Sequence, residues 1–390
     1  FIGTSQSRVR ALIAEFGLHL QPTYAKGKHI WELSDRRYDF EGLAPSLDPV
    51  HGLDLGHLVS LSDRLALQVG AEAPWAAPQA AELDAQTLAQ WVEAHSYTGL
   101  VREFATIMTR AVIGADPDEI SALFWAWYVA QGDSIEVLTG GPGGAQDSVI
   151  EGGAQQLSLR LAAPLGEAVR LGQPVRRVAQ TEQGVEVHTD EGLFRGRRVI
   201  LALPPSMAAT IEFEPGLPAD RRELQARAPM GRYAKAVATY ARPFWRDKGF
   251  AGDAGSLRGP VVATYDDSSA DGAALLAFVG GDAERGWRTL EAPQREAAVL
   301  ECLARWFGPE ALQPLAYVEH DWTLDPWLRG APVTILPPGV LSRLGPALRR
   351  PCDRIHWAGT EAATRWTGYI DGALRAGEAA AAEVVAALRA

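Results

Sequence analysis

Apolar residues recur every three to four positions in several stretches of the chain, which is the pattern of a helix with one buried face. One such stripe consists of Val9, Leu12, Ile13 and Phe16, and Gly17 ends it. The same spacing predicts helices over residues 5–16, 82–94, 97–113 and 291–307.

A strong helix start signal lies further along the chain, at Asp116. An Asp that can cap is followed by Pro117 in the first turn and by two acids near the positive helix end. Ile120 and Leu123 then continue at helical spacing. The pattern therefore predicts a helix that begins at Asp116.

Short apolar runs bounded by turn residues indicate strands. Residues 41–80, which separate two such groups, are rich in Pro, Gly and Asp and predict loops around one helix. The predicted strands cover residues 28–40, 174–178, 185–189, 194–203, 232–240, 261–265, 274–279, 315–322 and 355–358.

The C-terminal segment combines a strand, a glycine turn and a helix. Residues 355–358 form the strand, Gly359 breaks it, and the chain becomes helical from Gly368 with small residues along one face. Free backbone N–H groups at the helix start, near Gly368 and Tyr369, favour an anion or an electron-rich carbonyl. For a strand–turn–helix alone, the simpler interpretation is a terminal pair that only closes a sheet.

Composition narrows the functional classes. The 390 residues suggest two domains or one large two-lobed unit, and 47% hydrophobic residues are ample for sizeable cores. A formal net charge of −11 argues against a nucleic-acid partner. No apolar run reaches the roughly 18 residues of a membrane span, and no signal peptide is recognised, so we expect no membrane partner and a cytoplasmic location.

Few residues outside these patterns indicate chemistry. Neither zinc-ligand spacing nor a Ser-His-Asp set is present, so we expect no metal. Lys235 is unusual because it lies in a strand of Ala, Val and Tyr, where a buried ammonium is costly without partners. A strand lysine more often points to solvent, and the sequence context has to decide between the two.

That context resembles a known family. The order A-G-T-E, then W-T-G-Y-x-D-G-A and A-G-E in residues 358–378, is similar to the C-terminal signature of the flavin-dependent amine oxidases, the monoamine oxidase family. Further similarities are the opening FIGTSQSRV, residues 230–235 with the following P-F-W, and the D-W and W-L-R-G motifs near residue 322. The resemblance covers nearly the whole chain.

The resemblance implies a two-lobed α/β fold. An FAD-binding lobe with a parallel sheet would consist of residues 1–40, 145–210 and 340–390. A substrate-binding lobe with a mixed sheet and a helical insertion would consist of residues 41–144 and 211–339.

The resemblance also implies FAD as the cofactor and assigns residues to it. Phe1 would lie beside the flavin, the Val175 backbone would contact the adenine, and Trp322 would pack near the ring. Ala331 stands where covalent members have a cysteine, so the FAD is expected to be noncovalent. The C-terminal residues expected along FAD are Gly359, Thr360, Glu361, Thr367, Gly368, Tyr369 and Ile370.

Two residues are implied to be catalytic. Lys235 would hold a water against flavin N5, and Tyr369 would form one wall of an aromatic cage for the amine. Pro332 stands at the other wall, so only half the cage is present. The expected substrate pocket consists of Gln146, Met108, Val112 and Pro332, although for Met108 and Val112 the sequence favours core packing over a place in the pocket.

The implied activity is oxidation of a small-molecule amine. A hydride passes from the carbon next to nitrogen to flavin N5, the imine hydrolyses, and O2 is reduced to H2O2. One alternative is an amino-acid or polyamine oxidase of the same superfamily. A second is a non-catalytic binding protein that has lost its cofactor site.

One part of the family pattern is not found. No G-x-G-x-x-G occurs in the chain, whereas the family begins with a strand–G-x-G-x-x-G–helix unit that seats a pyrophosphate. We expect activity to require that unit, either from a segment preceding Phe1 or from another chain. The sequence leaves the oligomeric state open between a monomer and a homodimer.

Overall fold

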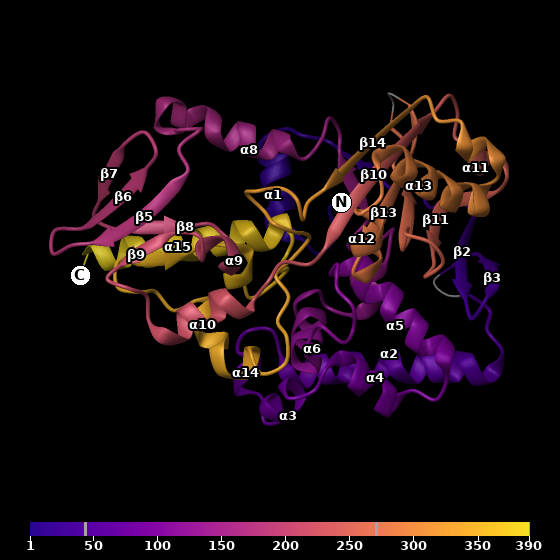
Figure 1. Cartoon of the computed structure of the whole chain (residues 1–390), viewed down its shortest axis with the longest axis horizontal. Coiled ribbons are helices and arrows are strands. Elements are labelled where there is room, and N and C mark those ends of the chain that lie inside the picture. Colours follow the sequence, from indigo (N-terminus) through magenta and orange to yellow (C-terminus); the bar gives the residue numbers. More distant parts are fainter. Residues whose placement is uncertain (43–44, 270–271, 390) are drawn as a thin grey trace.

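The computed structural model of the protein describes residues 1–42, 45–269 and 272–389. Figure 1 shows two lobes, with a large sheet and a helical block at one end and smaller sheets around the C-terminal helix at the other. The fold is mixed α/β, as the sequence predicts. None of the helices in the described ranges is long and apolar enough to cross a membrane.

The large sheet has seven strands in the order β14-β10-β13-β12-β11-β2-β3. It is mixed, because β11 pairs with β2 in parallel while the other neighbours are antiparallel. Its strands are β2 (Lys28–Leu33), β3 (Arg36–Phe40), β10 (Tyr233–Tyr240), β11 (Phe250–Gly255), β12 (Ala263–Asp266), β13 (Ala273–Gly280) and β14 (Ala316–Asp321). The helices that accompany it are α11 (Phe244–Asp247), α12 (Asp282–Trp287) and α13 (Ala292–Phe307).

Alternation along β10 gives this sheet two different faces. Ala234 and Ala236 lie in a core that contains the buried residues of α13. Tyr233 and Val237 lie on the opposite face, in the core of the helical block. Lys235 shares this second face because it lies between them at period two.

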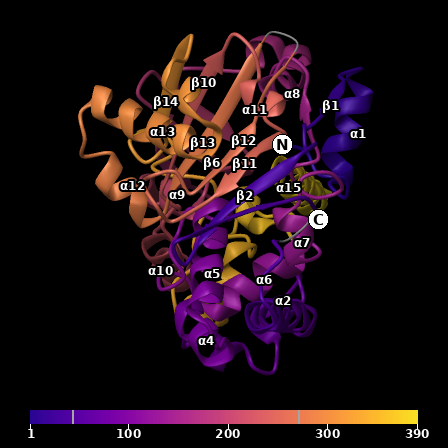
Figure 2. The same cartoon turned by 90° about the vertical axis from the view of Figure 1, so that its right-hand side faces the viewer.

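The helical block packs against that second face. Figure 2 shows these helices gathered below the sheet. They are α2 (Pro49–Val69), α3 (Ala80–Asp84), α4 (Leu88–His95), α5 (Gly99–Val112), α6 (Ala122–Gln131) and α7 (Ile135–Thr139).

Two helix predictions in this block differ from the structure. The helix predicted over residues 82–94 is broken, because Thr87 forms a capping box that starts α4 anew. The helix predicted from Asp116 begins at Ala122, where Ser121 caps it. Asp116 cannot act as a cap there, because its carboxylate binds the Arg110 side chain and the Asp282 amide.

The other lobe surrounds α15 (Ile370–Arg389). A parallel pair, β15 (Ile355–Trp357) with β8 (Val199–Leu201), lies near this helix. The remaining strands of the lobe are β1 (Leu20–Pro22), β4 (Ser148–Ile150), β5 (Val175–Gln180), β6 (Val185–Thr189), β7 (Leu193–Gly196) and β9 (Glu212–Glu214). Its other helices are α1 (Ser7–Glu15), α8 (Gln155–Ala162), α9 (Pro205–Ala208), α10 (Ala219–Arg227) and α14 (Leu341–Leu344).

One segment, residues 28–40, lies in the sheet of the other lobe and not in the lobe predicted for it. Residues 28–40 were assigned to the FAD-binding lobe, but β2 and β3 form one edge of the seven-stranded sheet. The cause is the parallel pairing of Ile30 and Trp31 with Ala254 and Gly255 of β11. A pairing partner more than 200 residues away leaves no signal in the local pattern.

The start of α15 requires close backbone packing. A Cβ added to Gly372 would lie 2.1 Å from the Trp366 carbonyl oxygen and 3.0 Å from Thr360 Oγ1. Asp371, which is fully buried, accepts hydrogen bonds from the Arg8 and Val9 amides and so caps α1. Helix α15 therefore holds both the preceding loop and the first helix.

We predict that Gly372→Ala destabilises the protein by about 1–3 kcal/mol, because the backbone of residue 366 has to move. Gly377→Ala in the same helix is the matched control, since a Cβ there meets nothing within 4 Å. This control should be neutral or stabilising by up to about 1 kcal/mol. Denaturant unfolding of both variants measures the difference, and equal stabilities would contradict the close packing.

Candidate active site

Lys235 lies in the middle of the sheet face that carries the site. It is paired with Phe278 on one side and His320 on the other, and its Nζ lies 5.4 Å from the centre of the Phe278 ring. Solvent reaches the side chain, yet desolvation lowers the pKa of its ammonium, an effect that the Asp267 charge partly opposes. Both observations fit a lysine whose side chain is surrounded by protein but still reached by solvent.

Aromatic rings connect Lys235 with Phe1. The Phe278 ring lies 5.5 Å from Tyr265 and 5.2 Å from Tyr233, and Tyr265 lies 5.7 Å from Phe1 (centre to centre). Phe1 is thus placed on the same side of the sheet as Lys235, and its position beside the flavin stays a prediction.

Trp322 follows β14 directly. Its amide donates to the Tyr233 carbonyl at 3.1 Å, and its ring lies 4.2 Å from that of His320. Because Tyr233 is two residues before Lys235, this bond fixes Trp322 beside the Lys235 strand.

The loop before α15 is closed by its own threonines. Thr360 Oγ1 accepts from the Gly368 amide at 2.8 Å, and Thr367 Oγ1 donates to Gln131 Oε1 at 2.6 Å. Gln131 ends α6, so the helical block holds this loop directly. The arrangement brings together Gly359, Thr360, Thr367, Gly368, Tyr369 and the exposed start of α15 at Ile370.

Glu361 is a buried carboxyl within the same loop. Its Oε1 accepts from the Thr334 hydroxyl at 2.6 Å, while its Oε2 is buried and bonded to no group in the described ranges. Burial raises the pKa of this carboxyl. A protonated Glu361 has a free donor for a ligand atom, which suits the polar parts of FAD.

A second segment joins the Lys235 strand to this loop. The Ala331 and Ile335 amides donate to the carbonyls of Gly231 and Pro229, just before β10. The same segment packs closely on Gly368, because a Cβ added to Gly368 would lie 2.9 Å from Val333 Cγ2. Residues 331–335 therefore connect the strand of Lys235 with the loop of Tyr369.

Tyr369 packs edge-on against Trp366, with ring centres 4.9 Å apart. Burial raises the pKa of its hydroxyl to about 12, so the phenol stays protonated. Tyr128 of α6 also interacts with this hydroxyl. Pro332, next to Val333, lies beside Gly114 instead of supplying a second aromatic wall.

Gln146 lies just before β4, close to the chain segment of Phe1. Ile2 pairs with Ser148 through amide bonds of 2.7 and 3.1 Å. Gln146 Nε2 donates to the Leu138 carbonyl at 3.3 Å, and its buried Oε1 has no partner within the part of the chain that the structure describes. That oxygen is a suitable acceptor for an amine N–H.

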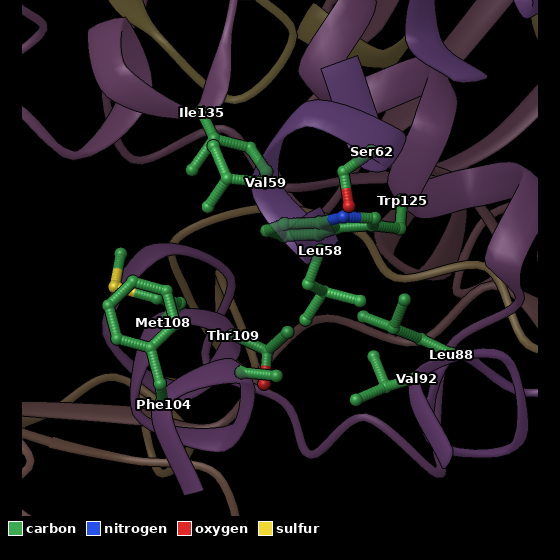
Figure 3. A pocket seen from close by; sticks show the side chains of 11 residues that line it. Leu58, Val59, Ser62, Leu88, Val92, Phe104, Met108, Thr109, Trp125 and Ile135 are labelled. Carbon is green, nitrogen blue, oxygen red and sulfur yellow. The ribbon is translucent and has the colours of Figure 1, made fainter. Parts of the chain in front are cut away.

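Met108 lines an apolar cavity of about 20 Å³ inside the helical block. Figure 3 shows Met108 and Phe104 on one side of it, with Leu88 and Val92 on the other. Val112, one turn further along α5, is half-buried and is not among the lining residues. The structure thus assigns a cavity to Met108 and none to Val112.

Val175 is distant in the fold from the other site residues. It begins β5 in the four-stranded sheet of the smaller lobe, and Figure 1 shows this sheet at the far end from β10. An elongated dinucleotide would have to extend between the two places.

Three contributors to the site carry no recognisable sequence signal. Gln131 and Tyr128 lie in an apolar run whose pattern predicts only core packing. Phe278 lies opposite Lys235 because of the register between β10 and β13. Register pairing between β10 and β13 could have suggested Phe278, but both strand partners had to be known first.

The helix start, the buried carboxyl and the ring-lined lysine together suit a flat cofactor with an electron-rich carbonyl edge. Residues 1–385 match the family model described as flavin containing amine oxidoreductase. The chain belongs to this family. Its members use a flavin, and the residues above fit FAD.

Similar proteins agree with this assignment. Cyclohexylamine oxidase from Brevibacterium oxydans IH-35A superposes with a TM-score of 0.97 at 36% identity, over 100% of this chain and 87% of that one. Wild-type putrescine oxidase bound to putrescine gives 0.95 at 31% identity, over 99% and 87%. An L-amino acid dehydrogenase of a Synechocystis species is 35% identical over 404 residues, covering 100% of this chain and 84% of the relative.

Family membership confirms the predicted class: the protein is a flavin-containing amine oxidoreductase, and its cofactor is FAD. In the site, the backbone N–H groups at the start of α15 would face the electron-rich edge of the ring. Glu361 and the aromatic residues near Lys235 complete the set of groups that would hold it.

We predict that the FAD is released by acid precipitation, because Ala331 offers no thiol for a covalent bond. The flavin should appear entirely in the supernatant, measured by its absorbance. Flavin that stays with the pellet would reveal an attachment at another residue.

Proposed function

We propose that the protein oxidises amines whose substituent is apolar and uncharged, using noncovalent FAD. The supporting observation is Lys235, a partly desolvated lysine that solvent still reaches, on a sheet face joined to the Tyr369 loop. The reaction consumes the amine, O2 and water and gives a carbonyl compound, ammonia and H2O2. We also propose that the protein is located in the cytoplasm.

Bound FAD supplies the hydride acceptor and passes the electrons to O2. Lys235 holds a water on the reacting side, and its lowered pKa lets the ammonium exchange a proton more easily than a free lysine. The start of α15 stabilises negative charge that develops at the far edge of the ring. Tyr369 and Gln146 orient the amine between them.

The apolar cavity supports the choice of substituent. Its lining contains no charged side chain, and Ser62 and Thr109 are its only hydroxyl residues. The flexible Met108 can move to admit an apolar group that exceeds the space available. A second ammonium, as in a diamine, would find no carboxylate there.

An amino-acid substrate requires an available guanidinium. Three arginines near the site strands are already paired: Arg232 with Glu119, Arg246 with Asp266 at 2.6 Å, and Arg110 with Asp116 at 2.6 Å. These pairings favour a simple amine over an amino acid. The non-catalytic alternative is tested by flavin absorbance of the purified protein.

We predict that Lys235→Met keeps bound FAD and slows turnover by roughly 10²-fold, because the held water and its proton exchange are lost. Lys28→Met, at an exposed position at the start of β2 in the same sheet, is the control and should leave turnover unchanged. Visible absorbance measures bound FAD, and O2 consumption measures turnover. Loss of the fold in Lys235→Met would mean that the residue is structural.

We predict that Met108→Ala shifts the kcat/KM ratio of 2-phenylethylamine to propylamine upward by roughly tenfold, because the cavity enlarges. Met207→Ala is the matched control, since Met207 is equally buried but lies in α9 of the other lobe. Both variants lose stability, but a ratio within one variant is independent of the folded fraction. If the kcat/KM ratio is unchanged in Met108→Ala, the cavity is not part of the substrate site.

A further inference from the structure

Two carboxyl groups meet on the face of the large sheet opposite to Lys235. Asp321 ends β14 opposite Ala234, and Glu284 comes from α12. The Glu284 side chain is fully buried. Thr323 lies between them, and its hydroxyl contacts both acids.

The contacts of that hydroxyl require a proton on one acid. Thr323 Oγ1 lies 3.0 Å from Glu284 Oε1 and within a short hydrogen bond of Asp321 Oδ1. A hydroxyl has one hydrogen to donate, so it can satisfy only one carboxylate oxygen. The second contact is favourable only if the other carboxyl is protonated and donates to Oγ1.

The remaining oxygens point to the same conclusion. Glu284 Oε2 and Asp321 Oδ2 are both buried, and neither is bonded to any described donor. Two buried carboxylates facing the same hydroxyl would be strongly unfavourable if both were charged, whereas a proton on one acid removes one of the two charges. Asp321 Oδ1 also accepts from the Thr323 amide at 2.9 Å, which favours keeping the negative charge on Asp321.

Charged groups around the pair do not replace this proton. Arg288, one turn further along α12, has its Nε 3.6 Å from Glu284 Oε1, beyond hydrogen-bond distance. The charge of Arg232 interacts with that of Glu284, but its guanidinium donates a hydrogen bond to Glu119. Glu119 also accepts a hydrogen bond from Arg285 at 3.3 Å. The arginines of this region are therefore directed mainly at Glu119.

We propose that Glu284 and Asp321 share one proton, and that this carboxyl pair is a positioning device for the adjacent Trp322. Trp322 lies between Asp321 and Thr323 in sequence, and its amide bond to Tyr233 fixes it beside the Lys235 strand. The link to Trp322 rests on the proposed function, whereas the shared proton does not.

The direction of titration follows from the environment. Burial first, and then the Asp321 charge, raises the pKa of Glu284 above its usual value of 4.5. The folded state therefore binds a proton that the unfolded state loses above that value. The contribution of Glu284 to the free energy of unfolding is fully present at low pH and is lost as the pH rises through its folded-state pKa.

The test is Glu284→Gln, since an amide imitates the protonated acid in shape and in its donor. We expect the unfolding temperature at pH 8 to stay equal to the wild type or rise. The unfolding temperature of the variant relative to that of the wild type should increase from pH 5 to pH 8, because only the wild-type Glu284 has a proton to lose. Scanning calorimetry on the FAD-loaded protein measures both.

Glu119→Gln is the matched control, because Glu119 is an ionised acid whose pKa its surroundings lower, with the Arg232 hydrogen bond and charge outweighing burial. The same substitution there should reduce the unfolding temperature by roughly 2 °C or more. A loss of that size in Glu284→Gln, or a variant that does not fold, would show that Glu284 is an anion and overturn the shared proton.

The positioning role is tested by kcat with cyclohexylamine across pH 7–10. The wild type should lose activity at the alkaline end more steeply than Glu284→Gln, since loss of the shared proton releases the Trp322 segment. Parallel profiles would overturn the positioning role. If no amine is oxidised, the proposed function fails, while the calorimetric comparison still decides the shared proton.

Discussion

The arrangement of the whole molecule depends on the close contact between Gly372 and the backbone of residue 366. The carbonyl of Trp366 occupies the space that any side chain at position 372 would need. The loop is thereby folded back on the start of α15, so Thr360 reaches the Gly368 amide and Thr367 reaches Gln131. Since Gln131 belongs to the helical block, the loop that packs on Gly372 is also bonded to the other lobe.

The chemistry depends on a second constraint, the period of a strand. Alternation in β10 sends alanines toward α13 and leaves Tyr233 and Lys235 on the other face. A lysine fully enclosed there would lose much of its charge, but solvent still reaches Lys235 while the surrounding protein lowers its pKa. The same period places Asp321 on the opposite face, away from the reacting groups.

The family and the fold class could be predicted from the sequence, for identifiable reasons. Motifs that combine rare residues in a fixed order indicated the family and proposed Lys235, Tyr369 and the start of α15 as parts of the site, since each combination serves one local geometry. Contacts between distant segments were not readable. The pairing of residues 28–40 with β11 and the bond from Gln131 to Thr367 exist only after folding, and Asp116 was misread because its distant partners determine its role.

Glu119 and Glu284 show why charge states are also beyond the sequence. Both are glutamates near the same arginines, yet their pKa values shift in opposite directions. Arg232 donates to Glu119, so Glu284 is left to face another acid across a threonine hydroxyl. The Arg232 guanidinium is directed at Glu119, and the Arg288 Nε comes only within 3.6 Å of Glu284. Glu284, with another acid and a single distant arginine beside it, is the acid that we propose keeps its proton.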